Sequence, residues 1–170
     1  NTLEKVVTEY PEAAFIMSAG DQVETAHNER QFSAFFSPVQ LRRIPVAPCL
    51  GNHDRGAYNT FYHFNLPNLS TQYGVTEPGI GNYYFKYGKA LFIVLNSNNR
   101  DSASHESFVF EIVNANPHME WKIVMFHDDI YGSGYHAAVL SMINLRKDLV
   151  PLFDSYGIDI VLTGHDHSYA

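Results

Sequence analysis

The segment Ile160-Val161-Leu162-Thr163-Gly164-His165-Asp166-His167 decides how the rest of this sequence is interpreted. Its first three residues form an apolar run that predicts a buried strand. The glycine that follows permits a tight turn and a close backbone approach. Two histidines so close to a strand end seldom serve packing, and in a turn such a pair can bind two adjacent metal ions from one short segment. The segment is therefore typical of a strand that carries a metal site at its carboxyl end.

Three earlier segments repeat this arrangement of an apolar run followed by polar side chains. They place Asp21 after residues 15–17, Asn52 and His53 after residues 46–50, and His127 after residues 123–126. In open α/β sheets, ligands bind at the carboxyl ends of the strands. If the strands are largely parallel, we expect all four clusters to meet at one edge. Asp, Asn and His side chains form a nitrogen and oxygen ligand set suited to zinc, iron or manganese.

Apolar runs alternate with helix-like segments along the chain, which predicts an α/β fold in one domain over residues 1–170. Helices are expected at residues 2–9, 27–36, 104–114 and 137–156, with Ser104 as an N-cap. Strands are expected at 13–17, 44–50, 82–87, 90–95, 121–126 and 158–162, the first buried on both faces and the third and fourth forming a hairpin. Residues 55–80 are predicted to form a long ordered loop, a feature that is usually functional.

Composition and charge limit the partners of this protein. The 170 residues are 45% hydrophobic and 17% charged, as in a folded protein. The net charge of −7 argues against nucleic acid as a polymer partner and against an anionic membrane. The negative charge does not argue against a small phosphate substrate, because bound metal ions would reverse the sign of the local electrostatic field. No stretch approaches the ~20 apolar residues of a transmembrane segment. Cys49 lies in an apolar run and is expected to be a buried structural thiol.

Taken singly, each polar segment has an ordinary structural interpretation. Gly20-Asp21 is a turn signal, Gly51-Asn52-His53-Asp54 can be a polar turn, and a lone His127 is often a structural histidine. The order of these segments and their shared position after strands together favour a metal site.

On these blocks the sequence resembles the calcineurin-like metallophosphoesterases, above all the purple acid phosphatase branch and its bacterial relatives. The signature of that family runs Asp-x-His/Gly, Gly-Asp, Gly-Asn-His-Asp/Glu, a histidine after a strand, and Gly-His-x-His. Four of these five blocks occur here in order. The resemblance implies central β-sheets flanked by helices in a four-layer αββα sandwich. Nothing before Asp21 offers the first block, so it is expected upstream of residue 1, where further sequence is expected because the chain starts at Asn1 and not at Met.

The resemblance also implies a metal ligand set. Asp21 would bridge two metal ions, and Asn52, His127 and His165 would complete the coordination of one of them. His167 would bind the second ion together with an upstream Asp. The cofactors implied are two divalent or trivalent ions drawn from iron, zinc and manganese. Glu24 stands where purple acid phosphatases carry a tyrosine that binds ferric iron, so an obligatory Fe(III) is not implied.

The residues expected beside the substrate are His53, His136, Asp54 and Arg55. By resemblance, His53 would be the general acid for the leaving group or a transition-state contact, and His136 a second substrate-facing histidine. Asp54 is a candidate to orient His53 by accepting its other ring N–H, and Arg55 is a candidate phosphate contact.

The reaction implied is metal-dependent hydrolysis of a small phosphate ester, preferably a monoester, by a metal-activated hydroxide. One alternative is a phosphodiesterase acting on nucleotides or phospholipid head groups. Another is a degenerate, non-catalytic metal-binding module, which only the missing first block favours. Family resemblance alone favours a secreted or cell-surface location. The oligomeric state stays open, as does the activity of this fragment by itself.

Overall fold

Two β-sheets organise the chain in the computed structural model, which describes residues 2–168. The smaller sheet pairs β1 (Ile16–Ser18) with β2 (Val46–Pro48) in parallel. The larger sheet has the order β3 (Tyr83–Tyr87), β4 (Ala90–Val94), β5 (Trp121–Met125) and β6 (Ile160–Leu162). Strands β3 and β4 form an antiparallel hairpin, while β5 and β6 run parallel to β4.

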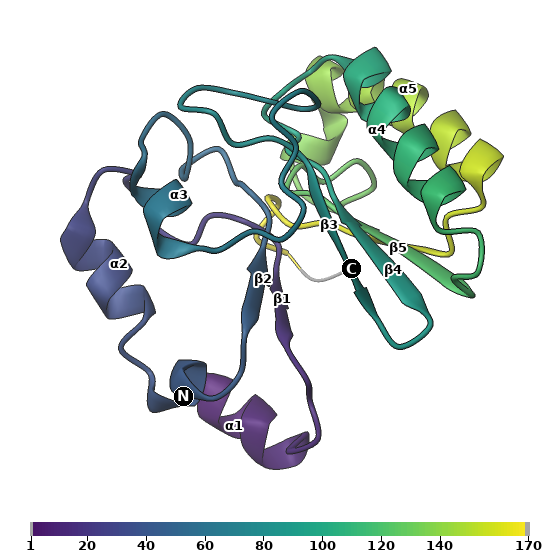
Figure 1. Ribbon diagram of the computed structural model, residues 1–170. Helices are drawn as coiled ribbons and strands as arrows, with labels where there is room; N and C mark the ends of the chain where they lie inside the picture. The colour runs from purple at the N-terminus through teal and green to yellow at the C-terminus, as the bar shows by residue number, and fades with distance from the viewer. Residues whose placement is uncertain (1, 169–170) are drawn as a thin grey trace.

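Helices cover the outer faces of the two sheets (Figure 1). Helices α4 (Ser102–Ala115) and α5 (Leu140–Tyr156) lie side by side on the larger sheet. Helix α2 (Glu29–Phe35) lies on the side of the smaller sheet that faces away from the larger one. The remaining helical elements are α1 (Thr2–Glu9), η1 (Val39–Arg42), α3 (Asn59–His63) and η2 (His136–Ala138). The arrangement is the expected α/β sandwich of two sheets between helices.

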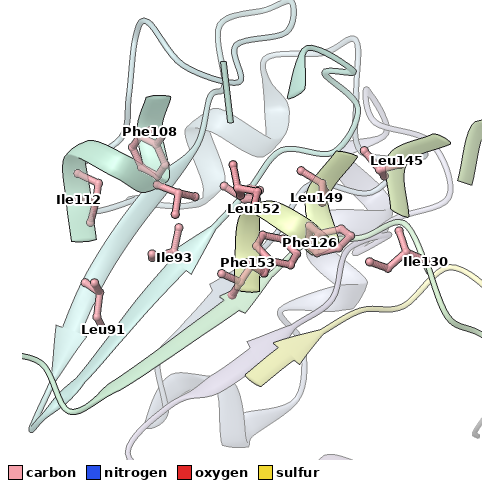
Figure 2. Close-up of a cluster of buried hydrophobic side chains, with 13 residues drawn as sticks. Leu91, Ile93, Phe108, Ile112, Phe126, Ile130, Leu145, Leu149, Leu152 and Phe153 are labelled. Atoms are coloured by element: carbon pink, nitrogen blue, oxygen red, sulfur yellow. The ribbon is translucent and has the colours of Figure 1, made fainter. Parts of the chain in front are cut away.

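Three apolar clusters hold these layers together. The largest lies between the larger sheet and helices α4 and α5, and includes Ile93, Phe108, Phe126 and Leu149 (Figure 2). A second lies between the two sheets, where Cys49, Tyr83, Val94 and Met125 meet. The third joins α2 to the smaller sheet around Phe32. Residues 93 and 94 enter different clusters because successive side chains of a strand point to opposite faces.

Most predicted elements are present, with shifts that tertiary packing explains. The helix at residues 2–9, the hairpin and the buried Cys49 are confirmed. Strand β1 begins at Ile16 and is only half-buried, since among the described residues it pairs with β2 alone. Strand β6 was expected to be buried but is exposed, because it lies at the edge of its sheet.

Two local predictions were wrong. The segment 55–80 was expected to be loop throughout, but it contains the short helix α3. This helix is held by tertiary contacts, since the ring of its His63 stacks on Phe32 of α2 at a centroid distance of 4.4 Å. The N-cap of α4 is Asp101 and not Ser104, because the Asp101 side chain accepts a hydrogen bond from the Ser104 N–H at 3.3 Å. Within residues 2–168, no helix combines the length and apolar character needed to cross a membrane.

A buried histidine on α4 gives a first testable prediction, for stability. His105 is fully buried; its Nε2–H donates to the Asn99 carbonyl at 2.9 Å, and its Nδ1 accepts from the Asn82 amide at 3.1 Å. Burial lowers the pKa of His105, so the folded chain keeps it neutral. We expect His105→Gln to lower the free energy of unfolding by about 1–3 kcal/mol near neutral or higher pH.

The difference in free energy of unfolding between wild type and His105→Gln should become smaller as pH falls below about 6.5, the ordinary pKa of histidine. The unfolded wild-type chain then takes up a proton that the folded chain resists, so the wild type loses this part of its stability. Urea denaturation of both proteins at about pH 8 and about pH 5.5 measures the difference. An unchanged difference would contradict a neutral buried His105.

Candidate metal centre

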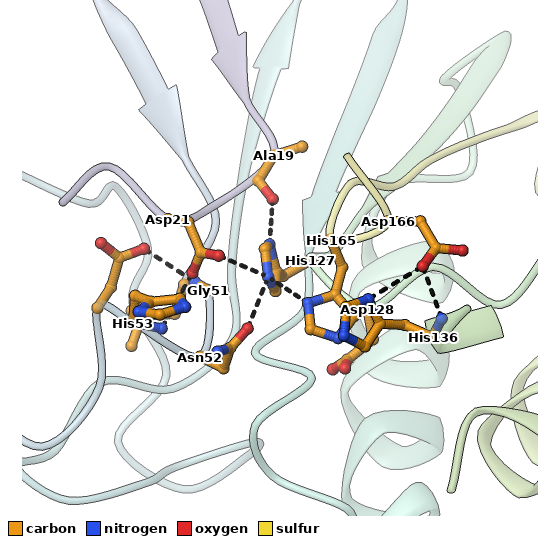
Figure 3. A network of polar contacts seen from close by, with 12 residues as sticks. Ala19, Asp21, Gly51, Asn52, His53, His127, Asp128, His136, His165 and Asp166 are labelled. Carbon is orange, nitrogen blue, oxygen red and sulfur yellow. Dashed lines mark hydrogen bonds and ion pairs between the residues drawn. The ribbon is translucent and has the colours of Figure 1, made fainter. Parts of the chain in front are cut away.

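Four polar side chains meet where strands of both sheets end. Asp21 follows β1, Asn52 follows β2, His127 follows β5 and His165 follows β6. Potential ligand atoms of Asp21, His127 and His165 all lie within 4.8 Å of one another. Figure 3 shows these side chains pointing toward a common centre. Parallel strands bring the predicted clusters together in pairs, as the sequence implied, and the packing of the two sheets brings the two pairs to one place.

His127 lies at the middle of this group. Its Nε2 atom is 3.1 Å from Asn52 Oδ1, 3.1 Å from His165 Nδ1 and 3.3 Å from Asp21 Oδ2. On the opposite side of the ring, Nδ1 is 2.7 Å from the Ala19 carbonyl oxygen, so Nδ1–H is the donor there. This contact leaves the Nε2 lone pair directed into the group, as is usual for histidines that bind metals. A proton on Nε2 could be donated to only one of its three neighbouring atoms, whereas a cation could bind Nε2 and all three neighbours.

Glycines beside the centre are required by close packing. A side chain at Gly51 would overlap the Asp21 carboxylate, and a Cβ at Gly20 would lie 2.5 Å from His127 Nδ1. Gly20 also has a φ of +97°, which favours glycine. The sequence pattern suggested turns at these positions, and the structure adds that the side chains of the centre fill the space.

Several site residues adopt the left-handed backbone conformation. The φ angles of Asp21, His165 and His167 are 53°, 72° and 48°. Each such residue costs about 1–2 kcal/mol relative to ordinary backbone, so surrounding contacts must hold it in place. For Asp21, one such contact is the hydrogen bond from the His53 N–H to Oδ1 at 3.0 Å.

The charges of the centre are strongly coupled. Burial alone would raise the pKa of Asp21, but hydrogen bonds from His127 and His53 lower it overall. Burial alone would lower the pKa of His127, but the hydrogen bond and charge of Asp21 raise it. Burial, and then the neighbouring His127, lower the pKa of His165. The ionised Asp21 carboxylate therefore favours a proton on His127, and a bound cation would take the place of that proton.

The expected contact between Asp54 and His53 is wrong. The fully buried Asp54 carboxylate accepts hydrogen bonds from the Gly51 N–H at 2.9 Å and the Val23 N–H at 3.3 Å. Burial raises the pKa of Asp54, and these donors oppose the rise. The Asp54 side chain is buried, whereas that of His53 is partly exposed, so these neighbours have different partners. Asp54 thus shapes the loop that carries Asn52 and His53.

Glu24 takes the place that was expected for Asp54. Its backbone carbonyl lies 3.0 Å from His53 Nδ1, and its carboxylate lies 3.4 Å from the same atom. The ring of His53 is therefore held through Nδ1, which leaves Nε2 available to a substrate. Glu24 thus contacts His53 and is not part of the group of ligand atoms formed by Asp21, His127 and His165.

The remaining predicted residues lie around this group. The ring centroid of His136 is 4.2 Å from that of His165, so His136 borders the centre. His167 and Arg55 are exposed, and His167 is not part of the group of ligand atoms found among residues 2–168.

Sequence reasoning missed Asp166 as a functional candidate. Its buried carboxylate accepts hydrogen bonds from the N–H groups of Gly134, His136 and Ala137 and contacts the His136 ring. Burial acts against the charge, but the backbone donors lower the pKa of Asp166 overall. An acidic residue between two histidines looks like any polar turn residue, so no local signal marks it.

The chain belongs to the calcineurin-like phosphoesterase family, whose profile matches residues 1–169. It is 31% identical over 146 residues to purple acid phosphatase 1 of Ipomoea batatas, covering 79% of this chain and 30% of that protein. It is 38% identical over 48 residues to purple acid phosphatase 3 of Arabidopsis thaliana, covering 28% of this chain and 12% of that protein. These similarities confirm the resemblance to the purple acid phosphatase branch. The chain spans less than a third of the length of either relative.

A solved structure supports the fold. The structure of GAP50, described as the anchor in the inner membrane complex of Plasmodium, matches 97% of this chain and 59% of its own chain. The TM-score is 0.59 and the sequence identity is 20%, so the likeness concerns the fold alone.

Proposed function

We propose that this chain carries the metal-binding catalytic site of a phosphoester hydrolase that acts on small phosphomonoesters. The observation that supports this most directly is the convergence of three ligand atoms on His127 Nε2, at 3.1 to 3.3 Å. Membership of the calcineurin-like phosphoesterase family supports metal-dependent hydrolysis of phosphate esters in general.

The residues present fit a metal ion. One carboxylate, one amide oxygen and two imidazoles form a donor set suited to zinc, iron or manganese. The free thiol of Cys49 is buried in the cluster between the sheets and is not part of this set. When bound, the metal ion lowers the pKa of a water molecule and withdraws charge from the phosphoryl oxygens. Asp21, Asn52, His127 and His165 would hold it.

A second metal ion is part of the proposal. Asp21 would contribute to both ions, and the exposed His167 would bind the second. His167 lies close to the centre along the chain, two residues after His165.

His53 and His136 would act on the substrate. The Nδ1–H of His53 donates to the Glu24 carbonyl, which leaves Nε2 to contact the phosphoryl group or to protonate the leaving oxygen. His136 would stabilise charge on the phosphoryl oxygens from the side of His165. Both side chains are partly exposed, at 37% and 47%, so a substrate can reach them.

Metal analysis and substrate comparison test the proposal on the complete gene product. We expect bound metal, loss of activity after chelation, and recovery with zinc, iron or manganese. We also expect 4-nitrophenyl phosphate to be hydrolysed with a higher kcat/KM than bis(4-nitrophenyl) phosphate. Faster hydrolysis of the diester would favour a phosphodiesterase, and a metal-loaded protein without activity toward either ester would favour a non-catalytic module.

A further inference from the structure

The carboxylate of Asp166 joins two loops beside the metal centre (Figure 3). Its side chain is 1% exposed. Oδ1 accepts from the His136 N–H at 2.8 Å, and Oδ2 accepts from the N–H groups of Gly134 and Ala137 at 2.9 and 3.3 Å. A buried carboxylate with this many donors is a strong and specific anchor.

The same carboxylate also holds the imidazole of His136. His136 Nδ1 lies 3.1 Å from Asp166 Oδ1, so Nδ1–H donates and Nε2 is the free ring atom. The ring is thereby fixed by a hydrogen bond on one side and by the ring of His165 on the other, with an interplanar angle of 40°. Asp166 thus controls both the backbone and the ring orientation of His136.

The loop that carries His136 is shaped to receive this carboxylate. A Cβ at Gly134 would lie 2.7 Å from Asp166 Cγ, and one at Gly132 would lie 2.5 Å from Asp166 Oδ2. Residues 126–135 form no helix or strand, and η2 begins only at His136. The hydrogen bonds to Asp166 therefore help to hold the end of this loop and the start of η2.

We propose that Asp166 is the positioning residue that sets His136 against the substrate side of the metal centre. The inference rests on the proposed function, since it assigns His136 a contact with the phosphoryl group. Asp166 acts through His136 and does not itself touch the substrate, because its carboxylate is buried under the loop.

Asp166→Ala and Asp166→Asn test this role in the metal-loaded complete gene product. We expect Asp166→Ala to lower kcat by about 10- to 100-fold with metal content unchanged, since misplacing a contact by about 1 Å has effects of this size. Asp166→Asn keeps one acceptor oxygen in the same space and should recover part of the loss. Ser133→Ala is the matched control, because it removes the 3.3 Å contact with Ser168 that joins the same two loops without touching His136. It should leave kcat unchanged.

A double-variant comparison separates positioning of His136 from a general structural role. With His136→Ala already present, Asp166→Asn should change kcat by less than about twofold, because the residue it positions is gone. An undiminished effect in that background, or loss of metal in Asp166→Asn, would overturn the proposal.

The crystal structure of Asp166→Ala gives a readout that does not depend on activity. The His136 ring should leave its place beside His165 while His165 stays where it is. A ring that keeps its place overturns the positioning role, even in an active enzyme. If the His136 ring is displaced but the wild-type protein hydrolyses no phosphate ester, the positioning role is supported. The proposed function is then refuted.

Discussion

His127→Ala is expected to remove bound metal and to lower kcat/KM by about 10³-fold or more. His127 Nε2 is the atom on which Asn52, His165 and Asp21 converge, so its loss would remove the central atom of the proposed ligand set. A metal ion supplies several kcal/mol of transition-state stabilisation, and each ~1.4 kcal/mol corresponds to a tenfold change in rate. Metal analysis of the purified variant and steady-state kinetics with 4-nitrophenyl phosphate give the two measurements.

The control for this variant is His118→Ala, which removes an exposed histidine that lies before β5. It should keep both metal and activity. Circular dichroism must show that His127→Ala is folded, because the buried ring also bonds to the Ala19 carbonyl. A folded His127→Ala protein with normal metal content would remove His127 from the ligand set, and a folded one with normal activity would refute the proposed site.

His53→Ala is expected to lower kcat by about 10²–10⁴-fold while metal content stays near that of the wild type. His53 is held at Nδ1 by Glu24 and lies outside the three-residue ligand group, so the structure places it beside the centre and not in it. Proton donation to a leaving alkoxide is the step that would be lost. The effect should therefore be smaller for a substrate whose leaving group is already acidic, such as 4-nitrophenol.

Comparing 4-nitrophenyl phosphate with an alkyl phosphate, each with wild type and His53→Ala, measures this dependence. His27→Ala, which removes an exposed histidine in the loop before α2, is the matched control and should behave as wild type. Loss of metal in His53→Ala would make His53 a ligand. A loss of kcat that is equal for both esters would favour a phosphoryl contact over proton donation, and full activity would exclude both roles.

The sequence alone predicted the order of helices and strands and the positions of the metal-centre side chains. Strand and helix periodicities are local, so apolar runs such as residues 121–126 could be recognised without knowledge of their neighbours. Because parallel strands end at one edge of a sheet, the pairing of Asp21 with Asn52 and of His127 with His165 also followed, whereas the meeting of these two pairs depends on how the two sheets pack. These are consequences of chain direction and residue type, both of which a sequence carries.

Only the tertiary structure decided which side chains support that centre. The Asp54 carboxylate accepts a hydrogen bond from its own loop, and the Glu24 carbonyl contacts the His53 ring. The Asp166 carboxylate accepts hydrogen bonds from three backbone N–H groups about 30 residues away in sequence. The exposure of β6 and the helix at α3 likewise depend on which neighbours are present. Such contacts join segments distant in sequence, and the direction of a side chain in a turn depends on those contacts. No local pattern of residues carries that information.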